Sequence, residues 1–159
     1  IFCEPEVERT IRQAFAYAFD PVNQAYPAGG VPRLAFRTLD SQPFEVLGQR
    51  LVPVRLLHGR YNVLGFRIGK VAYCTDTNEI PPESLALLQN LDVLILDCLR
   101  PEPHPTHLSL DEAVSVARQL APRRTLFTHI SHHLEHQATN ALLPPGMELA
   151  YDGLAVPLS

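Results

Sequence analysis

The stretch LDVLILDCLRPEPHPTHLSLDEAVSVARQLAPRRTLFTH, residues 91–129, decides the fold class. It opens on LDVLIL, a continuous apolar run that is typical of a strand buried on both faces. SLDEAVSVARQLA follows, with Ser109 as predicted N-cap and Glu112 at the capping-box position. RTLFT then predicts a second buried strand. Strand, helix and strand in this order predict an α/β protein.

The sequence on either side extends this pattern. Upstream, RLAFRTL, FEVLG and RLVPVRLL indicate strands, and Gly69-Lys70 predicts a hairpin turn inside NVLGFRIGKVAYCTD. EPEVERTIRQAFAYAF and PPESLALLQN indicate helices, and MELAYDGLAVPL indicates short strands around Asp152-Gly153. Hairpins followed by alternating strands and helices predict one mixed sheet. We therefore expect residues 1–159 to form a single domain.

Composition restricts the classes of partner. The 159 residues carry a net charge of about −4 and no block of basic residues, so we expect no nucleic-acid partner. No apolar run approaches the roughly 20 residues of a membrane helix, so no membrane contact is expected. Three widely spaced cysteines, Cys3, Cys74 and Cys98, indicate small buried side chains in a reducing cytoplasm.

Asp and His follow the apolar runs. RLVPVRLL ends at His58, VAYC leads to Asp76, LDVLIL ends at Asp97, and RTLFT ends at His129. Ligands collect beyond strand ends, so these four residues predict one shared site. Their oxygens and nitrogens suit zinc, manganese or iron, and the two oxygens of Asp76 could bridge two ions. Each residue alone also has an ordinary explanation as a cap or a turn former.

Histidines are concentrated after the last buried strand. RTLFTHISHHLEH holds four of the seven in the chain, and a purely structural strand end has no need of repeated imidazoles. His133 and His136 are expected on a solvated surface. In PEPHPTHLSL, a rigid proline-rich loop could hold His107 over a neighbouring site, although the spacing alone favours a solvated loop histidine. His104 is interpreted as solvated.

Five motifs in a fixed order resemble a known family. They are LLHGRYNVLGFRI, VAYCTDTNEIPPESLALL, LDVLILDCLRPEPHPTHLSLDEAV, RTLFTHISHH and MELAYDGLAV. The chain resembles the metallo-β-lactamase-fold hydrolases, in particular the branch that includes the phosphoribosyl cyclic phosphodiesterase. The resemblance covers about residues 44–158. It implies part of an αββα sandwich, with mixed sheets and flanking helices.

The resemblance also implies a role for each matching residue. His58 matches a ligand of a first divalent metal ion, Asp76 the carboxylate that bridges two ions, and His129 a ligand of the second. The two ions would be zinc or manganese, with iron as a further candidate. His107 matches a catalytic histidine that assists cleavage of a phosphate ester.

Two further residues have implied supporting roles. His132 matches a histidine that binds a separate structural zinc in some relatives. Asp97 lies where a carboxylate could hydrogen-bond to a metal ligand and orient it.

The family's hallmark His-x-His-x-Asp-His is absent from these 159 residues. We therefore expect the chain to be the C-terminal part of a hydrolase domain of roughly 250 residues. Each metal would then lack about half of its protein ligands, and the chain alone would be inactive.

The predicted function is metal-dependent hydrolysis of a small phosphodiester in the cytoplasm. One alternative is an RNA-processing nuclease, because tRNA 3′-processing endonucleases share a similar motif layout. Another is a non-catalytic fragment or interaction module. A short natural product would bury its exposed sheet edge by forming a homodimer.

Overall fold

The computed structural model describes residues 1–25 and 30–157. The chain divides into two compact units, residues 1–42 and residues 43–159. Within the described residues, no helix has both the length and the apolar character needed to cross a membrane.

The first unit is small and contains three short helices among its described residues. Its elements are β1 (Phe2–Cys3), α1 (Pro5–Ala14), the 3-10 helix η1 (Ala16–Ala18), α2 (Pro21–Ala25) and β2 (Arg37–Thr38). β1 pairs in parallel with β2. The predicted strand RLAFRTL is therefore reduced to the two residues of β2. Pro5 begins α1, because its missing N–H costs nothing in a first helical turn.

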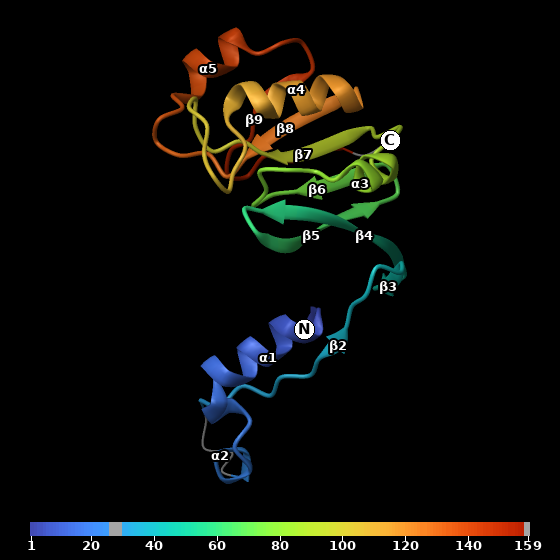
Figure 1. The fold of residues 1–159 in the computed structure, drawn as a ribbon, viewed down its shortest axis with the longest axis vertical. Helices are drawn as coiled ribbons and strands as arrows, with labels where there is room; N and C mark the ends of the chain where they lie inside the picture. The colour runs from blue at the N-terminus through green and yellow to red at the C-terminus, as the bar shows by residue number, and fades with distance from the viewer. Residues whose placement is uncertain (26–29, 158–159) are drawn as a thin grey trace. The chain divides into compact units, whose positions relative to one another are not determined.

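The second unit contains a seven-stranded mixed sheet (Figure 1). Its strands lie in chain order: β3 (Phe44–Val46), β4 (Gln49–His58), β5 (Tyr61–Ile68), β6 (Val71–Cys74), β7 (Val93–Asp97), β8 (Arg124–Thr128) and β9 (Met147–Leu149). Strands β3 to β6 are antiparallel, and β6 to β9 are parallel. The predicted α/β class, mixed sheet and turn at Gly69-Lys70 are confirmed.

Three helices accompany this sheet: α3 (Pro82–Leu87), α4 (Leu110–Leu120) and α5 (His136–Leu142). Figure 1 shows α4 lying across β7 and β8. The helix begins at Ser109 with the predicted capping box. The Ser109 side chain accepts from the Glu112 N–H, and the Glu112 carboxylate accepts from the Ser109 N–H. Two otherwise unpaired backbone donors are thereby satisfied.

The core lies between this helix and one face of the sheet. Leu94, Leu96 and Phe127 are fully buried in the same apolar cluster as Ala113 and Ala117 of α4. Successive strand residues point to opposite faces, so the other face carries the row Phe66, Tyr73 and Ile95. Tyr73 in this row is 47% exposed. The second face is therefore apolar and incompletely covered by the described residues.

The end of the chain differs from the prediction in one respect. MELAYDGLAVPL forms only one strand, β9, because residues 150–157 have no ladder partner. The predicted turn at Asp152-Gly153 is present, and Leu154 N–H donates to the Tyr151 carbonyl across it.

Strand direction explains why one edge of the sheet collects polar residues. β6, β7 and β8 are parallel, and β4 runs in the same direction because two antiparallel steps separate it from β6. The carboxyl ends of all four strands therefore meet at one edge.

Candidate metal centre

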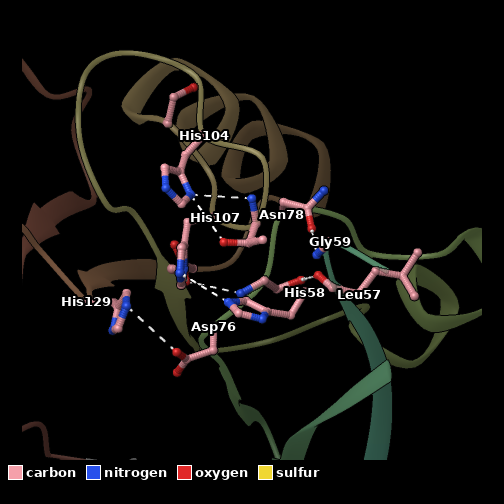
Figure 2. A network of polar contacts seen from close by, with 12 residues as sticks. Leu57, His58, Gly59, Asp76, Asn78, His104, His107 and His129 are labelled. Carbon is pink, nitrogen blue, oxygen red and sulfur yellow. Dashed lines mark hydrogen bonds and ion pairs between the residues drawn. The ribbon is translucent and has the colours of Figure 1, made fainter. Parts of the chain in front are cut away.

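The four polar residues predicted at strand ends converge at this edge, and His107 joins them. Two groups of three result: His58, Asp76 and His107, and Asp97, His107 and His129. Within each group, the nitrogen and oxygen atoms that could bind a metal lie within 4.8 Å of one another. Figure 2 shows His107 between His58 and His129, with Asp76 on the open side. His107 is common to both groups.

A buried carboxylate holds His107 in place. Asp97 Oδ2 lies 2.9 Å from His107 Nδ1 and also accepts from the Thr77 backbone N–H at 3.1 Å. Asp97 is fully buried, and its Oδ1 has no hydrogen-bond partner among the described residues. An ionised carboxylate only accepts, so Nδ1 carries the proton of this contact. Nε2 of His107 is consequently the atom that faces the site.

His58 and His107 direct their Nε2 atoms toward each other. The two atoms are 3.2 Å apart, and the ring centroids are 4.7 Å apart at an interplanar angle of 73°. Two nitrogens bound to one zinc ion at 2.0–2.1 Å in a tetrahedron would be separated by about 3.3 Å. The spacing therefore suits a shared ion as well as a hydrogen bond.

Asp76 and His129 form the open side of the site. His129 Nε2 lies 3.7 Å from Asp76 Oδ1, and their side chains are 40% and 51% exposed. Both residues have left-handed backbone, with φ of 61° at His129 and 55° at Asp76. Residues other than glycine adopt this region infrequently, and such outliers cluster at functional sites. The turns that follow β6 and β8 thus aim both side chains into the site.

The donors fit a divalent transition metal. They are imidazole nitrogens and carboxylate oxygens, the set used for zinc, manganese and iron. The unpartnered Oδ1 of Asp97 is a second indication, because a buried carboxylate oxygen without a partner is costly unless a cation lies nearby.

Contacts between loops hold the site together. Gly59, which follows His58, donates its N–H to Asn78 Oδ1 at 2.6 Å. A Cβ atom added at Gly59 would lie 3.0 Å from Thr106 Cγ2, and the backbone there has φ of 62°. Glycine at this position therefore allows the loop that carries His107 to approach β4. Sequence reasoning assigned no role to Gly59 or Asn78.

His104 lies beside the site, which corrects its interpretation as a solvated loop residue. Its ring centroid is 5.2 Å from that of His107, and its Nδ1 accepts from the Thr106 N–H at 3.3 Å. The pKa of His104 is lowered by desolvation and then by the positive charge of Arg100. The only available signal in the sequence was its place three residues before His107 in one proline-rich loop.

The other histidines lie outside both groups. His132 is exposed and packs against the exposed ring of His133, at 4.0 Å between centroids. The structural-zinc role of His132 stays a prediction. His136 is half-buried, with Nε2 3.2 Å from the Leu149 carbonyl oxygen, so it does not lie on the expected solvated surface.

The cysteines are free, buried and outside the donor groups. Burial raises the pKa of Cys74 to about 12, and burial together with the nearby Asp97 raises that of Cys98 to about 12. Burial therefore disfavours the thiolate form of both side chains.

Comparison with known proteins shows the same fold. Residues 1–130 match the family model of the beta-lactamase superfamily domain. The crystal structure of a diphosphatase from the PhnP family is 38% identical, with a TM-score of 0.86 over 96% of this chain and 55% of that chain. Zn(2+)-bound PqqB from Methylobacterium extorquens has a TM-score of 0.72, covering 99% of this chain and 64% of that chain. At 18% identity, it shows the fold alone.

A curated relative also matches almost the whole of this chain. An octanoyltransferase from Porphyromonas gingivalis is 31% identical over 157 residues, which are 97% of this chain and 31% of the relative. The chain thus spans about a third of this curated relative and about half of the PhnP-family diphosphatase.

Proposed function

The chain belongs to the beta-lactamase superfamily, and on this premise we propose that the whole protein is a metal-dependent phosphodiesterase. The observation that carries the proposal is the convergence of two donor groups on His107, whose ring is held by a buried carboxylate. Similarity to a PhnP-family diphosphatase supports phosphoester chemistry. The chain covers only 31% of the octanoyltransferase relative, so that name supplies no argument for acyl transfer here.

The proposed ligand roles come from the family resemblance, and the position of the three residues in the two donor groups supports them. His58, Asp76 and His129 would hold two divalent ions, with one Asp76 oxygen available to each. When bound, such ions lower the pKa of a water and stabilise negative charge on phosphoryl oxygens. Zinc, manganese and iron all suit this donor set.

The protein's own residues would orient the ester and deliver a proton. Asp97 accepts from His107 Nδ1 and fixes the ring, so Nε2 points toward the leaving oxygen. In our proposal, His107 carries a second proton on Nε2 when the ester is bound and transfers it to this oxygen as the P–O bond breaks, which leaves the ring neutral with its hydrogen on Nδ1. The substrate class is a small phosphodiester, and the location of the protein is the cytoplasm.

We propose that residues outside these 159 supply the remaining ligands. His-x-His-x-Asp-His is absent from the sequence, and His58, Asp76 and His129 alone leave open positions on two ions. The partly covered row of Phe66, Tyr73 and Ile95 supports the same idea, because an apolar sheet face needs a second layer. The 159 residues would then be the C-terminal part of an αββα domain.

The test compares two chains in one assay. The whole protein loaded with manganese or zinc should hydrolyse bis(p-nitrophenyl) phosphate, whereas the 159-residue chain should show no measurable turnover with either metal. The chelator-treated whole protein is the control. An inactive whole protein with all three candidate metals would contradict the phosphodiesterase proposal. Equal turnover by the short chain would contradict the proposed division of the ligands.

A further inference from the structure

The loop before His107 is a rigid support for a second histidine. Its base is closed by hydrogen bonds from Leu99 N–H to the Leu108 carbonyl and from Leu110 N–H to the Arg100 carbonyl, both 2.9 Å. Within it, the Arg100 guanidinium donates to the carbonyls of Glu102 at 3.3 Å and Pro103 at 2.9 Å. Prolines at 101, 103 and 105 further restrict the backbone. A residue on this loop is held in place before any substrate arrives.

That loop lies against the metal centre. Thr106 touches the turn after β4, where an added Gly59 Cβ would lie 3.0 Å from its Cγ2. His104 consequently lies beside His107, with ring centroids 5.2 Å apart and planes inclined by 39°. Figure 2 shows the His104 ring next to His107, on the side away from Asp76.

Hydrogen bonding selects the tautomer of His104. The Thr106 backbone N–H donates to Nδ1 at 3.3 Å, and the Thr106 hydroxyl lies 3.2 Å from the same nitrogen. A backbone N–H can only donate, so Nδ1 is the acceptor and the neutral ring carries its hydrogen on Nε2. Nε2 has no hydrogen-bond partner among the residues that the structure describes. It is therefore a fixed donor available to a ligand.

We infer that His104 is a substrate-binding residue whose Nε2–H donates a hydrogen bond to a non-bridging oxygen of the phosphodiester. This inference rests on the proposed phosphodiesterase activity and adds a second role to the loop. His107 transfers a proton, whereas His104 keeps its proton and orients the ester.

Two substitutions separate donation from ring packing. His104→Phe keeps a ring against His107 and removes the donor, whereas His104→Gln keeps an N–H donor and removes the ring. In the metal-loaded whole protein, His104→Phe should raise KM for bis(p-nitrophenyl) phosphate by at least tenfold, the usual value of a hydrogen bond to a charged group. His104→Gln should stay within about threefold of the unmodified protein. In both variants, kcat should change by less than about threefold and metal content should not change.

A binding measurement makes the test independent of turnover. The Kd of inorganic phosphate, measured by calorimetry, should rise with His104→Phe and recover with His104→Gln. If the whole protein hydrolyses no phosphodiester, the proposed function fails, and the phosphate affinities of the two variants still decide whether His104 binds the anion.

Three results would overturn the inference. Normal KM in the Phe variant with impaired KM in the Gln variant would show that the ring acts by packing. Loss of metal in either variant would make His104 a ligand. A fall in kcat at unchanged KM, larger for alkyl esters than for nitrophenyl esters, would make His104 the proton donor.

Discussion

Replacing His107 by alanine in the metal-loaded whole protein should lower kcat by roughly 10²–10⁴-fold while the metal content stays unchanged. The reason is that Asp97 fixes Nδ1 and leaves Nε2 to face the site, where our proposal puts the leaving oxygen. The loss should be smallest for esters of p-nitrophenol, because this leaving group needs little protonation. Comparing a nitrophenyl ester with an alkyl ester therefore measures the proton transfer itself.

The same variant decides between two roles for His107. The residue belongs to both donor groups, and its 3.2 Å approach to His58 suits a common metal ion. Loss of metal on His107→Ala, measured by elemental analysis, would show that it is a ligand and not the acid. His133→Ala is the matched control, because His133 is exposed and lies outside both groups. Equal losses of kcat for the two variants would remove His107 from the mechanism.

Asp76→Ala in the whole protein should strip more metal than His58→Ala, because a bridging carboxylate serves both ions whereas an imidazole serves one. His129→Ala should also lower the metal content. Elemental analysis of the purified variants gives the metal-to-protein ratio for each. The position of Asp76, 3.7 Å from His129 Nε2, is the geometric reason for this ranking.

The competing explanation is that Asp76 only shapes a turn. In that case Asp76→Ala would cost about 1 kcal/mol of stability, as the loss of a cap does, and the metal content would not change. Asp152→Ala is the matched control, since Asp152 is exposed in a turn outside both donor groups. A metal-to-protein ratio equal to that of the control would rule out the bridging role.

The residues that meet at the edge of the sheet could be predicted because their positions depend on local sequence patterns. Apolar runs identified the buried strands. The polar residues that follow these runs can be read from the sequence without knowing which residues they contact in the fold. The direction of β4 relative to β6 then follows from two hairpins. This explains why His58 and Asp76, 18 positions apart, were correctly expected at the same edge.

The contacts within the site could not be predicted in the same way. The Asp97–His107 hydrogen bond depends on the path of the loop between them, and that path depends on Gly59 admitting Thr106. His104 was misjudged for the same reason. Proline indicates a rigid loop, but it does not give the direction in which the loop lies. Contacts across 49 residues, as between His58 and His107, have no local signature.

The left-handed backbone of Asp76 and His129 sets the stability of the fold against the metal binding that we propose for these residues. Each such residue costs on the order of 1–3 kcal/mol relative to a relaxed conformation, and glycine would relieve most of that cost. Glycine has no side chain, so it would also remove the donor. A screen for heat resistance of the metal-free protein would therefore favour glycine at positions 76 and 129, and its best survivors would have lost both proposed metal ligands. A more stable variant that keeps these two side chains would have to gain its stability from substitutions at other positions.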